Sequence, residues 1–196
     1  MSPSEGEPFV TPPLAAIGVV RTPQQLHHEA PRQSGLGRGA EAEIELRQGM
    51  QNGLQDLDGF SHVWVLFWCH HARGARLQVQ PPRDQQKRGL FATRAPQRPN
   101  PIGLSCVRLE GIHKRVLRVS DCDLLDGTPV LDLKPYLPYC DSVPDAEIGY
   151  VAGLPEHQGD HREWWRDAGT EPPERYRRWL DGGGDGGGDG GGDQVR

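Results

Sequence analysis

The stretch SHVWVLFWC, Ser61–Cys69, is the most apolar and aromatic segment of the chain. It is short and bounded by polar residues, and its valines and aromatic residues favour a β-strand over a helix. Because successive strand residues point to opposite faces, a run that is apolar at nearly every position indicates a strand covered on both sides. We therefore expect Ser61–Cys69 to be a buried central strand that anchors the core.

Other short runs on both sides of this segment also favour strands. They are apolar or alternating, and turns containing Pro, Gly or Asp separate them. They are Ala15–Arg21, Ala42–Leu46, Arg76–Gln80, Gly89–Thr93, Gly103–Leu109, Val116–Ser120 and Val130–Lys134. Met50–Leu57 is expected to form one or two helical turns. Many short strands and few helical windows predict a mainly β fold, a small antiparallel β-barrel or strongly curved sheet with short peripheral helices, and disfavour a doubly wound sheet.

The composition divides the chain into four parts. Residues 1–13 are expected to be a flexible leader and residues 14–150 the barrel domain, in which the polar segment 24–39 forms a long loop. Residues 151–180 are a short C-terminal extension, with expected helices at Glu163–Arg166 and Pro173–Leu180. Residues 181–196 repeat GGGD, which cannot bury a core, so we expect a disordered tail there.

The charge of the chain is uneven. The formal net charge is −5, and the tail 181–196 contributes −3 of it, which leaves −2 for residues 1–180. A cluster of cations interrupted by one acid, Asp84, offers contacts to phosphates or forms a solvated loop: Arg83, Lys87, Arg88, Arg94 and Arg98. No apolar run reaches the ~18 residues of a membrane span, and the N-terminus lacks the pattern of a secretory signal. We therefore expect a cytoplasmic protein with no membrane segment.

Metal chemistry is not indicated. Cys69, Cys106, Cys122 and Cys140 are widely spaced without a CxxC pair, and we expect buried or half-buried thiols in a reducing compartment. His70 and His71 follow the aromatic strand, but adjacent strand residues point to opposite faces, and no third ligand lies at a supportive spacing. The sequence also contains no dinucleotide-binding glycine pattern, Walker loop or nucleophile elbow.

Two motifs carry most of the chemistry. FATRAPQRPNPIGLS, Phe91–Ser105, has prolines that fix an extended, rigid loop able to hold Arg94 and Arg98 toward a carboxylate or phosphate, although an arginine-rich surface turn has the same composition. DLLDGTPVLDLKPY, Asp123–Tyr136, contains an Asp-Gly turn leading into a strand. Its alternation is expected to place Val130, Asp132 and Lys134 on one face and Leu131 and Leu133 on the other. Asp132 and Lys134 either pair, bind a polar ligand, or form a solvated face.

Taken together, several stretches closely resemble the TrmO (TsaA-like) family. They occur in the family's order between Ile17 and Tyr150: IGVVRTP from Ile17, PRQ at Pro31–Gln33, the segment Gly53–His70, PPR at Pro81–Arg83, RGLFATRAPQRPNPIGLS at Arg88–Ser105 and DLLDGTPVLDLKPYLPYCDS at Asp123–Ser142. The resemblance implies a small β-barrel methyltransferase that binds S-adenosylmethionine near the interface of a homodimer. It also implies a substrate, N6-threonylcarbamoyladenosine beside the anticodon of tRNA, which is methylated on N6.

The resemblance further implies a set of cofactor contacts. They are Pro31, Arg32, Gln33, His70, His71, Arg94, Leu104, Leu125, Asp126, Gly127 and Thr128. Arg32 or Arg94 is expected to hold the methionyl carboxylate, and backbone groups near Leu104 and Leu125 the adenine edge. Because a carbamoylated nitrogen is a poor nucleophile, a base that removes its proton is expected to help, and Asp126 and His71 are the candidates.

The substrate is the point on which the sequence departs from longer relatives. They carry a fuller C-terminal domain associated with tRNA binding, whereas only a short segment follows Tyr150 before the tail. Phosphate contacts are expected from Arg83, Lys87, Arg88 and Arg98, with help from arginines of the extension; its tryptophans either stack on bases or pack. Two alternatives therefore stay open: a methyltransferase for another RNA or a small molecule, and a non-catalytic module that binds the cofactor or RNA.

Overall fold

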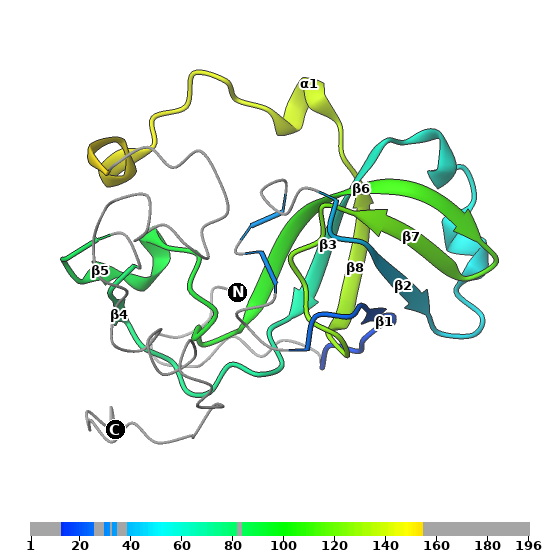
Figure 1. Cartoon of the computed structure of the whole chain (residues 1–196), viewed down its shortest axis with the longest axis horizontal. Helices are drawn as coiled ribbons and strands as arrows, with labels where there is room; N and C mark the ends of the chain where they lie inside the picture. The colour runs from blue at the N-terminus through cyan, green and yellow to red at the C-terminus, as the bar shows by residue number, and fades with distance from the viewer. Residues whose placement is uncertain (1–12, 26–29, 32, 35–38, 82–83, 155–196) are drawn as a thin grey trace, which may run out of the picture.

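The computed structural model describes residues 13–25, 30–31, 33–34, 39–81 and 84–154. Figure 1 shows a barrel on one side and, beside it, an extended region that carries a small two-stranded sheet. The segment after α1 (Pro138–Asp141) leads from the barrel toward this region and ends in the short helix η4 (Gly149–Gly153). The expected leader, the helices at 163–166 and 173–180 and the Gly/Asp tail lie outside the described residues.

The described strands form a closed antiparallel barrel in the order β1-β2-β7-β6-β3-β8. The bounds are β1 Gly18–Arg21, β2 Ala42–Leu46, β3 His62–Trp68, β6 Ile102–His113, β7 Val116–Ser120 and β8 Pro129–Pro135. β4 (Gln78–Val79) and β5 (Arg88–Gly89) pair separately, outside the barrel. The expected fold class, mainly β with an antiparallel barrel and short helices, is confirmed.

Alternation of side chains fills the barrel. β2 buries Ala42, Ile44 and Leu46 and leaves its other residues at least partly exposed, as a strand with one buried face does. The interior is completed by Val20, Val63, Val65, Val107, Leu117, Val119, Cys122, Leu124 and Val130. Branched residues of moderate size predominate because a six-stranded barrel is narrow.

The strand predictions for Ala42–Leu46 and Val116–Ser120 match the structure residue for residue. Ser61–Cys69 is confirmed as a strand between β6 and β8, although only its inward residues Val63 and Val65 are fully buried, and its outward side chains are half-buried. The helical turns expected at Met50–Leu57 appear as the 3₁₀ helices η1 (Gln51–Leu54) and η2 (Leu57–Gly59).

The strand predicted at Gly89–Thr93 is wrong. β5 ends at Gly89, and Leu90–Ala92 form the 3₁₀ helix η3. The Leu90 N–H still pairs with the Leu77 carbonyl at 2.8 Å, but both the backbone N–H and the hydroxyl of Thr93 turn back to the Leu90 carbonyl, at 3.0 and 2.8 Å. The turn closed by these hydrogen bonds therefore ends the strand where the sequence pattern extends it.

The face assignment of the predicted strand Val130–Lys134 is also wrong at Val130. Val130 is fully buried in the core, and Leu133, not Asp132, packs against the core further along the strand. A bulge explains the change, because the register against β3 shifts between Leu66 opposite Asp132 and Phe67 opposite Val130. The alternative that Asp132 and Lys134 pair with each other is confirmed, since Lys134 Nζ lies 2.7 Å from Asp132 Oδ2 on the outside of the barrel.

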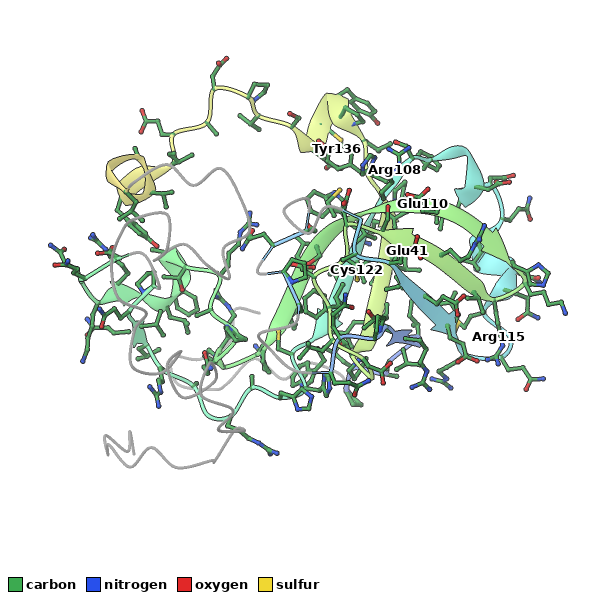
Figure 2. The ribbon with its side chains drawn as sticks, in the orientation of Figure 1. Glu41, Arg108, Glu110, Arg115, Cys122 and Tyr136 are labelled. Atoms are coloured by element: carbon green, nitrogen blue, oxygen red, sulfur yellow. The ribbon has the colours of Figure 1, made fainter. Side chains whose placement is uncertain are left out.

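The segment that follows β8 covers the outward side chains at the start of β3. Trp64 donates its indole N–H to Asp141 at 2.9 Å, and the Leu137 N–H donates to the same carboxylate oxygen at 2.9 Å. Tyr136 packs edge-on against Trp64 and His62, and Figure 2 shows it beside α1, near Arg108 of β6. Hydrogen bonds from Leu137 and Trp64 lower the pKa of Asp141.

The described residues include no helix long and apolar enough to cross a membrane. All four cysteines are free. Cys122 is buried and Cys69 and Cys106 are half-buried, as expected, but Cys140 is exposed because it lies on the outer helix α1. Burial raises the pKa of the Cys122 thiol to about 12, so it is an inert part of the core.

Gly103 allows β3 and β6 to pack closely. Phe67 lies opposite Gly103 in the register, and a Cβ added to Gly103 would lie 2.2–2.7 Å from atoms of the Phe67 ring. We expect Gly103→Ala to lower the free energy of unfolding by about 1–3 kcal/mol through overpacking, as measured by urea denaturation. Gly111→Ala in the same strand is the control, because its Cβ would meet only the flexible Arg118 guanidinium at 3.4 Å. Equal stability of both variants would contradict this packing argument.

Candidate functional site

The Asp-Gly-Thr-Pro turn is seated on the end of β1. The Gly127 N–H donates to the Val20 carbonyl at 2.9 Å, and the Val20 N–H donates to the Thr128 carbonyl at 2.9 Å. Gly127 has φ 73°, a conformation that favours glycine. Leu125 and Thr128 are buried, whereas Asp126 and Gly127 are partly exposed. The turn is therefore rigid, and its two central residues face outward.

Asp126 ties this turn to the start of the early loop. Its Oδ1 accepts the Thr22 N–H at 3.2 Å, and its own N–H donates to the Gln24 carbonyl at 2.8 Å. The carboxylate thus has a clear structural task. This observation weakens the case for Asp126 as a free general base.

The proline-rich loop is held by Arg98. Its Nη1 donates to the Thr93 carbonyl at 3.0 Å and also reaches the carbonyls of Leu90 and Ala95, both at 3.4 Å. Its guanidinium lies over the Phe91 ring, 5.6 Å from the centroid. Arg98 is half-buried, so it acts as a brace inside its own loop.

Arg94, unlike Arg98, makes its hydrogen bond to a different loop. Its Nη1 donates a hydrogen bond to Gln33 Oε1, which joins the proline-rich loop to the early loop across 61 residues of sequence. Gln33 belongs to the predicted Pro31–Gln33 contact set, and Pro31 beside it is buried. Arg32 lies outside the described residues. Arg94 itself is exposed, so its guanidinium can also meet a ligand.

A further acidic residue, Asp123, precedes the Asp-Gly-Thr-Pro turn and lies four residues before Gly127 in the sequence. Its Oδ1 is buried and has no hydrogen-bond partner in the described part of the chain. Burial raises the pKa of its carboxyl, while hydrogen bonds from the Ser105 side chain and the Ser34 backbone and the charge of Arg94 act in the opposite direction. Figure 2 labels its neighbour Cys122 where the barrel meets the extended region.

These contacts bring the predicted segments together. Ser34 follows Gln33, Ser105 follows Leu104, and Cys69, whose pKa is raised by burial and by the Asp123 charge, precedes His70. The Cys69 N–H donates to the Pro101 carbonyl at 2.7 Å, which joins the end of β3 to the proline-rich loop. The early loop, the histidine pair, the proline-rich loop and the Asp123–Thr128 segment thus form one cluster.

Sequence reasoning missed Asp123 as a site residue. It stands at the head of the second motif, but its only signal is an acid between apolar neighbours, Cys122 before it and Leu124 and Leu125 after it. An acid in such a position is unusual in a core and points to a specific role. Its contacts with Ser34 and Ser105 depend on the fold and leave no local pattern.

The rings of His70 and His71 contact each other in a tilted arrangement, with centroids 3.9 Å apart and an interplanar angle of 42°. The expectation that they point to opposite faces is wrong, because β3 ends at Trp68 and the pair lies in the turn that follows. Among the described residues, no group of three or more His, Cys, Asp or Glu side chains could hold a metal ion. His71 is exposed and His70 is half-buried.

Apolar side chains surround the site on the outside. Leu104 is 55% exposed, Phe91 75% and Ile102 38%. On the adjacent strand, Leu66 and Trp68 lie opposite Leu104 and Ile102 and are only half-buried. This part of the barrel surface is more apolar than a face that meets only water.

The cations proposed for RNA differ in their surroundings. Arg88 Nε lies 2.5 Å from Asp84 Oδ2, and its guanidinium covers the Tyr150 ring at 4.5 Å. Hydrogen bonds from Arg88 and the Gln86 backbone lower the pKa of Asp84. Lys87 is exposed, whereas Arg83 lies outside the described residues. Arg88 therefore connects β5 to η4, and Lys87 extends into solvent.

Comparisons with known proteins identify relatives over most of the barrel domain. The chain matches the family model of the tRNA-methyltransferase O N-terminal domain over residues 19–142. The tRNA (adenine(37)-N6)-methyltransferase of Escherichia coli K12 is 42% identical over 149 residues, 71% of this chain and 63% of that protein. A probable S-adenosyl-L-methionine-binding protein of Pyrococcus abyssi is 40% identical over 135 residues, 69% of this chain and 73% of that protein.

The fold comparison agrees. A crystal structure of TrmO from Pseudomonas aeruginosa has a TM-score of 0.61 and 42% identity, with 71% of this chain and 62% of that chain covered. The chain thus spans less than two thirds of the length of this structure and of the Escherichia coli relative.

The buried carboxyl of Asp123 predicts a pH-dependent stability difference. Because its pKa is raised in the folded state, the folded protein binds the proton more tightly than the unfolded chain, and the resulting stabilisation is lost as the pH rises from about 4 through the raised pKa. We expect Asp123→Asn, which stays neutral, to melt at a higher temperature than the native protein at pH 8. The difference shrinks toward pH 4, and a difference independent of pH would contradict the assignment.

Proposed function

The chain belongs to the tRNA-methyltransferase O family, and from that premise we propose that it transfers a methyl group from S-adenosylmethionine to N6 of the modified adenosine beside the anticodon of tRNA. This activity requires the protein to bind both S-adenosylmethionine and tRNA and to align the methyl group with the N6 nitrogen that receives it. The observation that carries the proposal is the meeting of Arg94, Gln33 and Asp123 in one cluster. The relatives that share these segments are named as methyltransferases of tRNA adenine 37 or as proteins that bind S-adenosylmethionine.

The cluster has the donors that such a cofactor requires. An exposed guanidinium at Arg94 suits the methionyl carboxylate, and Leu104 supplies an exposed apolar surface on β6. The proposed contacts are Pro31, Arg32, Gln33, His70, His71, Arg94, Leu104, Leu125, Asp126, Gly127 and Thr128. Arg94 is the better-supported partner of the carboxylate, because its neighbour Gln33 orients it.

S-adenosylmethionine supplies an electrophilic methyl group on a positive sulfur, whose charge is discharged when the N–C bond forms and the C–S bond breaks. The chain's own residues need to align the nucleophile and exclude water, and alignment is worth roughly 7–11 kcal/mol of the barrier. N6 loses its proton in the process. We assign this proton to His71, whose side chain is exposed, and the support of the turn to Asp126, whose carboxylate already accepts the Thr22 N–H.

A second copy of the chain completes the proposed assembly. We infer that the exposed side chains of Phe91, Ile102 and Leu104 contribute to it together with the half-buried Trp68, which lies opposite Ile102 in the sheet; Leu104 is itself one of the proposed cofactor contacts. Side chains of this kind on a protein surface mark interfaces more often than solvent-facing regions. We therefore place the interface of a homodimer on this face, with the cofactor near it.

Lys87 and Arg83 are the proposed phosphate contacts to tRNA. The proposed location of the reaction is the cytoplasm, where tRNA is modified. Arg88 and Arg98 act indirectly in this proposal, because Arg88 holds Asp84 and Tyr150 and Arg98 holds its own loop. Their replacement is expected to disturb the loops that carry the phosphate contacts.

Methyl transfer is tested with the purified chain, S-adenosylmethionine and tRNA isolated from cells that lack this methylation. Nucleoside mass spectrometry is expected to detect N6-methyl-threonylcarbamoyladenosine, and Arg94→Ala is expected to reduce its formation by at least about tenfold through loss of a charge-assisted contact. Arg73→Ala, an exposed arginine of the same region, is the control. If threonylcarbamoyladenosine stays unmethylated after incubation with the native chain, the proposed activity is refuted.

The interface is tested by sedimentation velocity. We expect the native chain to sediment as a dimer and Phe91→Ser to shift the distribution toward the monomer, because a largely exposed aromatic ring at an interface contributes about 1 kcal/mol or more to association. Tyr139→Ser removes an equally exposed aromatic ring from α1 and is expected to leave the dimer intact. A native monomer at micromolar concentration would exclude the shared interface.

A further inference from the structure

We propose that Asp123 is the positioning residue of the cofactor site: its carboxyl links the early loop, β6 and Arg94 so that their neighbouring residues meet the cofactor together. This inference rests on the proposed function and adds to it a residue outside the set of cofactor contacts. It is drawn from the interactions of one side chain with two stretches far from it in sequence, Ser34 in the early loop and the Arg94–Ser105 region.

The contacts of Asp123 lie one residue away from the proposed ligand contacts. The Ser34 backbone hydrogen-bonds to the carboxyl, and the preceding residue is Gln33. The Ser105 side chain hydrogen-bonds to it as well, and the preceding residue is Leu104. The carboxyl therefore fixes the backbone from which two proposed contacts project.

Arg94 closes the arrangement into a ring. The positive charge of Arg94 acts on Asp123, and Arg94 donates a hydrogen bond to Gln33 Oε1. Gln33 is bonded through the chain to Ser34, which returns to Asp123. Each member thus restrains the next, and movement of the carboxyl displaces the guanidinium that binds the methionyl carboxylate.

The burial of Asp123 separates this role from direct catalysis. Its Oδ1 is buried and the residue as a whole is half-buried, so we place the carboxyl behind the residues that meet the cofactor. Burial and the charge of Asp123 raise the pKa of Cys69, whereas the charge of Arg98 acts in the opposite direction. Asp123 acts on the reaction through the segments it holds.

A neutral residue of the same size would suit this position better if only stability mattered. A buried carboxylate loses its hydration, and replacement of buried charges by neutral groups of similar volume is often neutral or stabilising. Here one carboxylate oxygen also lacks a partner in the described part of the chain. In our proposal the carboxylate therefore serves the site that it organises and not the stability of the fold.

The experiment uses the full chain and three variants. Asp123→Asn keeps an acceptor for Ser34 and Ser105 but loses the attraction for Arg94, and Asp123→Ala loses both. Ser105→Ala removes one donor and leaves the carboxyl in place. Asp132→Asn is the matched control, because Asp132 belongs to the same sequence motif but lies on the outside in an ion pair with Lys134. Each protein is titrated calorimetrically with S-adenosylhomocysteine, and the KM for S-adenosylmethionine, kcat and melting temperature are measured.

The expected result is a separation of binding from stability. Asp123→Ala weakens S-adenosylhomocysteine binding and raises the KM for S-adenosylmethionine by about tenfold or more, with kcat changed by less than about threefold. Asp123→Asn and Ser105→Ala lie between Asp123→Ala and the native protein, and Asp132→Asn binds as the native protein does. Asp123→Asn melts no lower than the native protein, which a merely structural residue would not allow.

Two outcomes overturn the proposal. If Asp123→Ala binds as tightly as the native protein, the carboxyl does not position the site. If affinity and melting temperature fall together in Asp123→Asn, its role is structural. A native chain that does not bind S-adenosylhomocysteine at all would instead refute the proposed function, and the positioning role with it.

Discussion

Closure of the barrel by β1 against β8 is the constraint on which both fold and site depend. The seam is short, with Gly18 opposite Val130 and Val19 opposite Pro129. It continues through hydrogen bonds between Val20, Gly127 and Thr128, so the bonds that close the barrel also seat the Asp-Gly-Thr-Pro turn. The turn is consequently as rigid as the barrel, and a ligand that uses its backbone groups meets donors and acceptors already in place.

Most of the barrel follows from local patterns in the sequence. Alternation identified β2 and β7 to the residue, and the apolar run identified β3. The bulge in β8 has no such pattern, because it arises from the register between two strands, and strand pairing is set by the whole barrel. η3 was missed for a related reason: Leu90 is buried and its carbonyl accepts from Thr93, although strand propensity continues to Thr93.

The site shows the same division between local and tertiary information. The sequence singled out the proline-rich loop and the Asp-Gly turn, and the resemblance supplied their common ligand. The charge pattern alone could not separate Arg88, Arg94 and Arg98, since cations in one run look alike, and only the resemblance set Arg94 apart as a cofactor contact. The fold separates them: Arg88 neutralises Asp84, Arg98 holds its own loop, and Arg94 reaches the early loop. Only tertiary contacts distinguish a bracing arginine from one that remains available to a ligand.

The distribution of charge explains how a chain of net charge −5 can contain a site for a cofactor that carries both signs and for an anionic substrate. Some surface acids are paired with cations, as in Glu45 with Arg115 and Asp132 with Lys134, and exposed charges are screened by salt over about 10 Å. Asp123 is different, because a buried charge is weakly screened and acts strongly on its neighbours. One carboxyl in the interior therefore has more influence on the site than several acids on the surface, and its position beside Arg94 gives the cluster its local polarity.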